Sequence, residues 1–112
     1  MVAHQYAPDR GDLIWLQFSP QTGPEQAGHR PAIVLSPRSY NAKVGLAICC
    51  PITSQHKGYP FEVPLPQAAQ VNGVVLADQV KSLDWRKRQA KFIEKVPQAV
   101  LKETLGKIHT LL

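Results

Sequence analysis

The stretch DLIWLQF (Asp12–Phe18) is apolar and aromatic and lies between Gly11 and the Ser19-Pro20 pair. A run of this length, bounded by turn-forming residues, is typical of a β-strand buried on both faces. Ten prolines and seven glycines interrupt the chain every few residues, which favours short strands over long helices. The sequence predicts five further strands: Pro31–Leu35, Leu46–Ile52, Phe61–Leu65, Val74–Val80 and Arg88–Val96.

The segments around these strands are expected to be turns, loops and one helix. Asn41–Gly45 is expected to form a turn, and the alternation of apolar and polar residues in Phe61–Leu65 predicts a strand with one solvated face. The single expected helix is C-terminal, with Pro97 in its first turn. Its apolar face is expected to comprise Leu101, Leu105, Ile108 and Leu112. Short strands and one terminal helix predict a mainly β fold, a small bent antiparallel sheet or barrel with the helix packed on it.

Length and composition predict one globular domain spanning residues 1–112. A domain takes roughly 100–200 residues, and 44% of this chain is hydrophobic. There are no internal repeats, linkers or low-complexity tracts. No apolar run approaches the ~20 residues needed to cross a bilayer, and the N-terminus lacks the apolar stretch of a signal peptide. We therefore expect a cytoplasmic protein that does not associate with membranes.

The two cysteines, Cys49 and Cys50, are neighbours. Adjacent side chains on a strand point to opposite faces, so a disulfide between them is disfavoured. Two buried thiols in a reducing compartment are expected instead. The chain lacks the further ligands, at suitable spacing, that a zinc site needs. No metal site and no cofactor are predicted.

The net charge of +5 is concentrated in the last third of the chain. Residues 1–80 hold five basic and five acidic side chains, whereas residues 81–112 hold eight basic and three acidic ones. Such a surface suits a polyanion or an acidic protein partner, and a solvated basic face explains it equally well. If the surface binds RNA, affinity should fall steeply with salt.

The long polar loop before the second predicted strand ends in GPEQAGHRP, residues 23–31. It brings a carboxylate, a carboxamide, an imidazole and a guanidinium close together in sequence, from Glu25, Gln26, His29 and Arg30. A guanidinium offers a planar fork of donors that phosphate oxygens accept in pairs. Taken alone, a structural ion pair between Arg30 and Glu25 accounts for the same residues.

A second group of polar residues follows the third predicted strand. Thr53 and Ser54 offer hydroxyl groups that either donate to a phosphate or simply form a turn. Lys57, Tyr59 and Phe61 interleave a cation with two rings, an arrangement that grips single-stranded RNA by charge and stacking. Rings at such positions also pack into cores, so both interpretations stand at the level of single residues.

Five blocks of sequence, taken in order, resemble the MazF/PemK toxin family. They are GDLIW (11–15) with EQAGHRP (25–31), VLSP (34–37) with Tyr40-Asn41, TSQ (53–55), KGYPF (57–61) and LADQVKS (76–82). The blocks extend from near the N-terminus to Trp85, about three quarters of the chain. Chain length and the C-terminal helix agree with the family as well.

This resemblance implies a CcdB/PemK-like fold, a bent SH3-like barrel that forms a homodimer. It implies sequence-specific cleavage of single-stranded RNA, mRNA included, and a cognate antitoxin whose acidic tail covers the RNA groove. Arg30 and Thr53 stand where the family has its catalytic Arg and Thr, and Glu25 matches a position implicated in the reaction or in orienting that Arg. The RNA-binding residues are expected to be His29, Gln26, Ser54, Lys57, Tyr59, Gln79 and Lys81.

The chemistry expected from these residues is attack of the RNA 2′-hydroxyl on the adjacent phosphorus. The products are a 2′,3′-cyclic phosphate and a 5′-hydroxyl end. Arg30 and Thr53 are expected to donate hydrogen bonds to the phosphate oxygens, a metal-independent means of meeting the developing charge. Glu25 is the candidate base, His29 is an alternative, and Arg30 is also placed to lie near the leaving oxygen.

Two other functions remain open from the residues. The fold class also hosts CcdB-like toxins, which bind DNA gyrase through an aromatic–Gly–Ile type tail, but this chain ends in Thr110-Leu111-Leu112. A non-catalytic RNA-binding barrel predicts binding without turnover. Product formation on naked RNA separates the three functions.

Overall fold

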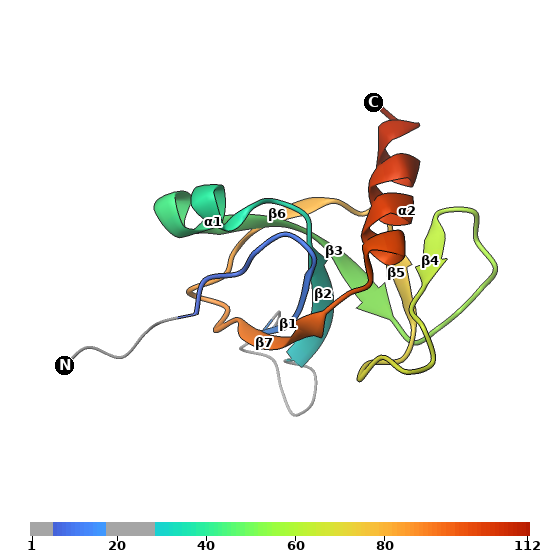
Figure 1. Ribbon diagram of the computed structural model, residues 1–112, viewed down its shortest axis with the longest axis horizontal. Helices are drawn as coiled ribbons and strands as arrows, with labels where there is room; N and C mark the ends of the chain where they lie inside the picture. The colour runs from blue at the N-terminus through green and yellow to red at the C-terminus, as the bar shows by residue number, and fades with distance from the viewer. Residues whose placement is uncertain (1–5, 18–28) are drawn as a thin grey trace.

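The computed structural model describes residues 6–17 and 29–112 and shows a bent antiparallel sheet with a helix at each end (Figure 1). The strands are β1 (Asp12–Gln17), β2 (His29–Val34), β3 (Leu46–Thr53), β4 (Glu62–Pro64), β5 (Val74–Leu76), β6 (Lys81–Asp84) and β7 (Lys91–Lys95). The helices are α1 (Arg38–Val44) and α2 (Gln98–His109). The mainly β fold with a C-terminal helix is therefore confirmed.

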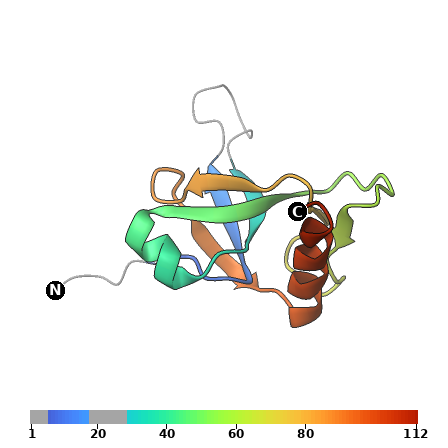
Figure 2. The same cartoon turned by 90° about the horizontal axis from the view of Figure 1, so that it is seen from above.

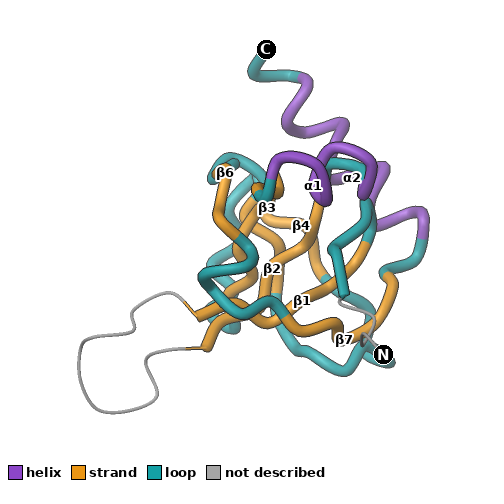
Figure 3. The backbone as a smooth tube through the Cα atoms, turned by 90° about the vertical axis from the view of Figure 1, so that its left-hand side faces the viewer, coloured by secondary structure: helices purple, strands orange, loops and turns teal. Residues whose placement is uncertain are grey.

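The sheet follows the order β4-β5-β3-β2-β1-β7, and β6 pairs with β3 off this path. The long strand β3 pairs with two short strands. Its start pairs with β6, and its end, Ile52 and Thr53, pairs with β5. Figure 3 shows the strands curving from β6 and β3 through β2 and β1 to β7. In the described part of the chain no pairing joins β4 to β7, so the barrel-like sheet is bent but open.

The central strands bury both faces, as the apolar run in β1 predicts. Leu13 and Ile33 pack into one core cluster together with α2, whereas Ile14 and Val34 pack into a second cluster around Trp85. Cys50 belongs to the first cluster and Cys49 to the second, because successive residues of a strand point to opposite faces. Both cysteines are free, and burial raises the pKa of each thiol to about 12. The prediction of two buried thiols is confirmed.

Helix α2 forms as expected, but its buried face differs from the predicted one. Val100, Leu101 and Thr104 are buried, whereas Leu105 and Leu112 are exposed. Thr104 tolerates burial because its hydroxyl donates a 2.8 Å hydrogen bond to the carbonyl oxygen of Val100. The prediction that Leu105 and Leu112 pack against the sheet was wrong.

Helix α1 replaces the turn predicted at Asn41–Gly45. Seven residues are too few to show a helical period, so the apolar pattern gave no signal. Buried Asn41 ties the helix to the chain around it, since its Nδ2 donates to the carbonyl oxygens of Pro8 and Ser36. Gly45 ends the helix in the left-handed conformation, with φ 82°. Figure 2 shows α1 and α2 at opposite ends of the molecule, with β3 running between them.

Two predicted strands also differ in detail. Of the predicted strand Val74–Val80 only Val74–Leu76 forms a strand, β5. A turn follows it, and a separate strand that was not predicted, β6, begins at Lys81. Glu62 in β4 is buried, although alternation predicted that it faces solvent, and the exposed residue of this strand is Pro64. Both differences lie beside the candidate site described below. Among the described residues, no helix has the length and apolarity needed to span a membrane.

Candidate RNA-cleavage site

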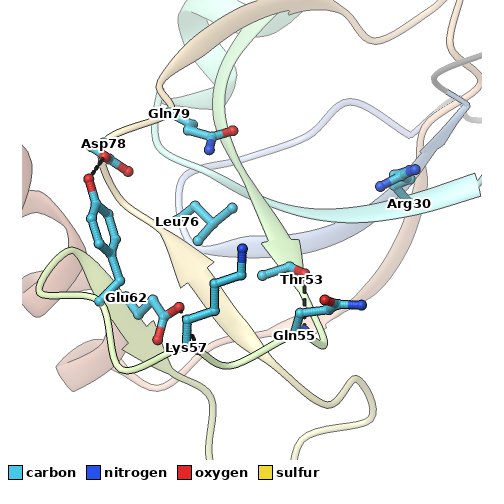
Figure 4. A pocket seen from close by; sticks show the side chains of 9 residues that line it. Arg30, Thr53, Gln55, Lys57, Glu62, Leu76, Asp78 and Gln79 are labelled. Carbon is cyan, nitrogen blue, oxygen red and sulfur yellow. Dashed lines mark hydrogen bonds between the residues drawn. The ribbon is translucent and has the colours of Figure 1, made fainter.

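A cavity of about 570 Å³ opens where β3 ends (Figure 4). Its lining comes from β2, β3, β4, β5, the loop after β3 and the turn after β5: Arg30, Thr53, Gln55, Lys57, Tyr59, Glu62, Leu76, Asp78 and Gln79. Five of the residues predicted from the sequence meet here, namely Arg30, Thr53, Lys57, Tyr59 and Gln79. The volume lies within the range of small-ligand sites.

Arg30 and Thr53 share one side of the sheet because of strand register. The β2–β3 pairing matches Ala32 with Pro51 and Ile33 with Cys50. Arg30 and Thr53 each lie two residues beyond Ala32 and Pro51, where the pairing ends, and residues two apart on a strand point to the same face. Arg30 is exposed and Thr53 is half-buried, which leaves both accessible to a ligand in the cavity.

The hydroxyl of Thr53 is oriented by its own chain. Its Oγ1 accepts a 3.1 Å hydrogen bond from the backbone N–H of Gln55. A hydroxyl that already accepts a bond still has its hydrogen to donate. Thr53 therefore forms the turn that the sequence suggested and also keeps a donor for a phosphate oxygen.

The loop after β3, residues 54–60 (hereafter the site loop), carries Lys57 and Tyr59. Figure 4 shows the Lys57 side chain pointing into the space between Leu76 and Thr53. The loop is tied to Glu62, whose carboxylate accepts 3.0 Å hydrogen bonds from the backbone N–H groups of Lys57 and Gly58. Burial acts to raise the pKa of Glu62, but these N–H donors outweigh it and hold the pKa below its usual value.

Tyr59 joins two segments that line the cavity, the site loop and the turn after β5. Its ring is 47% exposed, so it is not a core residue, whereas its neighbour Phe61 packs against the main core cluster. The hydroxyl donates a 2.6 Å hydrogen bond to Oδ2 of Asp78. This bond, together with the negative charge of Asp78, raises the pKa of Tyr59. An exposed ring beside Lys57 fits a stacking surface for a nucleic-acid base.

Four residues that line the cavity were not selected as site residues from the sequence: Gln55, Glu62, Leu76 and Asp78. Asp78 lies inside a block that carries the family resemblance, LADQVKS, and this placement was the available signal. Glu62 follows KGYPF closely, but its burial depends on the tertiary fold. The second oxygen of Asp78, Oδ1, is buried and has no hydrogen-bond partner within the part of the chain described.

Among the described residues, three predicted site residues do not line this cavity: His29, Ser54 and Lys81. His29 is exposed and its ring stacks on Trp15, with centroids 6.0 Å apart. Ser54 and Lys81 are exposed but do not line the cavity. Glu25 and Gln26 lie outside the described residues. Within residues 6–17 and 29–112, no cluster of three or more His, Cys, Asp or Glu side chains suits a metal ion.

Part of the basic C-terminal third is used by the fold itself. Arg86 lies 4.8 Å from the ring centroid of Trp85 and donates to the carbonyl oxygen of Ala42. Arg88 donates a 3.0 Å hydrogen bond to the carbonyl oxygen of Gln17. These guanidinium groups therefore have structural partners, in addition to any contribution they make to the surface potential.

Comparison with known proteins places the chain in a defined family. The profile described as "PemK-like, MazF-like toxin of type II toxin-antitoxin system" matches residues 9–112. The chain is 53% identical over 108 residues to the endoribonuclease toxin MazF of Escherichia coli strain K12, covering 96% of each chain. It is 36% identical over 110 residues to the endoribonuclease toxin ChpB of the same strain, covering 92% of each chain.

Solved structures agree. A crystal structure of MazE-MazF from Deinococcus radiodurans is 50% identical, with a TM-score of 0.87 over 96% of each chain. An endoribonuclease from a mycobacterial species shares the fold, with a TM-score of 0.74 at 17% identity over 96% of this chain and 93% of that one. By family profile and by sequence identity over nearly its whole length, the chain belongs to the PemK-like, MazF-like toxins of type II toxin-antitoxin systems.

Proposed function

We propose that this chain, as an endoribonuclease toxin of its family, cleaves single-stranded RNA such as mRNA at short specific sequences. The observation that carries the proposal is the shared cavity of Arg30 and Thr53, which adjoins the cation of Lys57 and the exposed ring of Tyr59. The relatives named endoribonuclease toxins support the same activity. Residues 1–112 act as a single catalytic domain in the cytoplasm.

The reaction is a transesterification within the RNA. The 2′-oxygen attacks the adjacent phosphorus, the 2′-proton passes to a base, and the bond from phosphorus to the 5′-oxygen breaks. The departing 5′-oxygen takes up a proton from an acid or from water. A cyclic 2′,3′-phosphate and a 5′-hydroxyl result. Charge builds up on the phosphate oxygens during this step, and preorganised donors lower the barrier by meeting it. Arg30 supplies a charged fork, and Thr53 supplies the hydroxyl hydrogen left after Oγ1 accepts from Gln55.

Glu25 is the proposed base that takes the 2′-proton. It lies five residues before Arg30 in the sequence. Glu62, the buried carboxylate of the cavity, is less suited, because both of its oxygens already accept backbone N–H groups. His29 is the alternative base or a contact to an RNA base. Arg30 also lies close to the leaving oxygen in this arrangement.

RNA is held by residues on both sides of the cavity. Lys57 neutralises a phosphate, Tyr59 stacks on a base, and Gln79 offers a carboxamide for hydrogen bonding to a base edge. Gln26, His29, Ser54 and Lys81 are the further residues proposed to contact RNA. Their basic and polar character also suits the acidic tail of a cognate antitoxin, and the MazE-MazF complexes of Deinococcus radiodurans support such a partner. We propose a homodimer as the active form.

The test is cleavage of a long single-stranded RNA by the purified protein in excess EDTA. Cut sites and end groups are mapped, and an Arg30→Ala protein prepared identically excludes contaminating ribonuclease. Cuts at one short sequence, with cyclic phosphate and 5′-hydroxyl ends that vanish in the variant, support the proposal. RNA that stays intact across a sequence library overturns it and directs attention to gyrase binding.

A further inference from the structure

Both oxygens of the Glu62 carboxylate accept hydrogen bonds from the site loop. Its side chain is 4% exposed, and its two oxygens each accept one backbone N–H at 3.0 Å, Oε2 from Lys57 and Oε1 from Gly58. His56 adds Nδ1 at 3.4 Å from Oε1. A buried carboxylate that accepts two successive N–H groups holds that backbone in one conformation, because releasing it leaves a buried charge without partners.

The backbone of the site loop is shaped to meet this carboxylate. Gly58 adopts φ +76°, the left-handed conformation in which successive N–H groups can converge on one anion. Nothing lies within 4 Å of a Cβ built on Gly58, so the requirement for glycine is conformational. The N–H of Glu62 in turn donates a 3.0 Å bond to the carbonyl oxygen of Tyr59. Lys57, Gly58 and Tyr59 are thereby fixed relative to β4.

A second restraint reaches the same segment from the C-terminal helix. Nζ of Lys107, on α2, donates a 2.6 Å hydrogen bond to the carbonyl oxygen of Pro60 and lies 3.4 Å from that of Glu62. Glu103, one turn earlier, lies 3.8 Å from the same Nζ. The site loop is therefore held by a carboxylate on one side and an ammonium group on the other.

We propose that Glu62 and Lys107 are positioning residues, which hold the site loop so that Lys57 and Tyr59 meet RNA in a preformed arrangement. The inference rests on the proposed ribonuclease function. Ordering one residue of a loose loop during binding costs about tenfold in affinity. Loss of either restraint is therefore expected to lower kcat/KM by about 3- to 30-fold, chiefly through KM.

The sign of the effect separates positioning from simple electrostatics. Glu62→Gln removes a negative charge near a polyanion site, so charge alone predicts tighter RNA binding. Positioning predicts the opposite, because the carboxamide nitrogen cannot accept an N–H. Glu94→Gln is the matched control. Glu94 also accepts a backbone N–H, from Gln70 at 2.9 Å, but it does not line the cavity.

Lys107→Met is compared with Lys102→Met, since Lys102 is an exposed residue of the same helix and its loss changes the net charge equally. RNA cleavage is measured for the wild type and all four variants, and amide hydrogen exchange is followed at Lys57 and Gly58. We expect Glu62→Gln and Lys107→Met to lose activity relative to their controls. In Glu62→Gln the two amides should exchange at least about tenfold faster.

The outcomes distinguish the two proposals. If the wild type does not cleave RNA, the proposed function fails, whereas the amide exchange still tests the restraint on the loop. If the wild type cleaves but Glu62→Gln matches or exceeds Glu94→Gln in kcat/KM, the positioning role is overturned. If Glu62→Gln does not fold, the Lys107 and Lys102 pair decides, and equal kcat/KM in that pair overturns the inference.

Discussion

The hydroxyl of Tyr59 lies 2.6 Å from Oδ2 of Asp78, a residue 19 positions further along the chain. Tyr59 belongs to the site loop and Asp78 to the turn after β5, so the bond joins two segments that line the same cavity. An exposed ring anchored by its hydroxyl presents one face in a fixed direction. It therefore loses little conformational freedom when a base stacks on it.

Tyr59→Phe tests this anchoring. The substitution keeps the ring but removes the donor, so we expect stacking to persist while KM for RNA rises by about 2- to 10-fold, the range of one hydrogen bond. Steady-state cleavage of a short RNA measures the change. Tyr40→Phe is the control, because Tyr40 is also exposed and lies on α1, outside the cavity lining. Equal KM values for the two variants would contradict the role.

Arg30→Lys should separate charge from geometry. Lysine keeps the positive charge but loses the planar fork that pairs with two phosphate oxygens. We expect RNA affinity to change little while kcat falls by about 10²- to 10³-fold. Single-turnover cleavage with saturating protein measures the chemical step.

Thr53→Val removes the proposed second donor while it retains the side-chain shape. A fall in kcat of similar order is expected, with recovery in Thr53→Ser, which keeps the hydroxyl. The backbone N–H of Gln55 loses its side-chain acceptor in Thr53→Val and keeps it in Thr53→Ser. Full activity of Thr53→Val would remove Thr53 from the mechanism.

Replacement by alanine is expected to have opposite effects on stability at Gly73 and at Gly106. Gly73 has φ +136°, and a Cβ there would lie 2.2 Å from the carbonyl oxygen of Thr53. Gly73→Ala is therefore expected to destabilise the fold by about 1–3 kcal/mol or more and to displace Thr53, so that activity falls as well. Gly106 lies in α2 with nothing near its Cβ position, so Gly106→Ala should stabilise by up to about 1 kcal/mol without loss of activity. Urea unfolding and RNA cleavage measure both effects.

The two thiols should be unreactive in the native protein. Burial raises the pKa of Cys49 and Cys50 to about 12, so little thiolate exists near neutral pH. Alkylation at pH 8 is expected to be roughly a thousandfold slower than in urea, in proportion to the lost thiolate. Mass spectrometry after timed exposure to iodoacetamide reports both sites. Rapid modification of the folded protein would contradict their placement in the core.

Acid should loosen the site loop through Glu62. The native pKa of this carboxyl lies below its usual value, so its contribution to stability is complete above the ordinary Glu pKa of about 4.3 and is lost as pH falls through the lower native pKa. His56 and Lys107 are the basic neighbours that face this segment. The stability difference between wild type and Glu62→Gln should shrink on acidification from pH 6 to pH 3. Urea unfolding across that range measures it, with Glu94→Gln as control.

Local sequence determined the strands whose apolar signal is strong. DLIWLQF predicted β1, and LAICCPI predicted most of β3, because strands buried on both faces need continuous apolar residues. The adjacent cysteines were predicted to be buried on opposite faces for the same reason. Motif blocks in order also led to the family, which pattern and composition alone do not identify.

The short elements were decided by contacts distant in sequence. Helix α1 depends on Asn41, whose side chain bonds to Pro8 and Ser36 and whose backbone oxygen accepts from Nε1 of Trp85. The strand that begins at Val74 ends at Leu76, and in the turn after it Asp78 accepts a hydrogen bond from Tyr59 of another segment. A local pattern cannot report such partners, since they are absent until the chain has folded.

The candidate site shows the same division. The sequence supplied Arg30, Thr53, Lys57, Tyr59 and Gln79 as residue types suited to phosphate and base. Only the tertiary structure brought Arg30 and Thr53 to one cavity, at the end of the β2–β3 pairing, and only it buried Glu62 beneath the site loop. The physical reason is that chemical character belongs to single side chains, whereas their mutual distances and burial arise from strand pairing and packing between segments far apart in the chain.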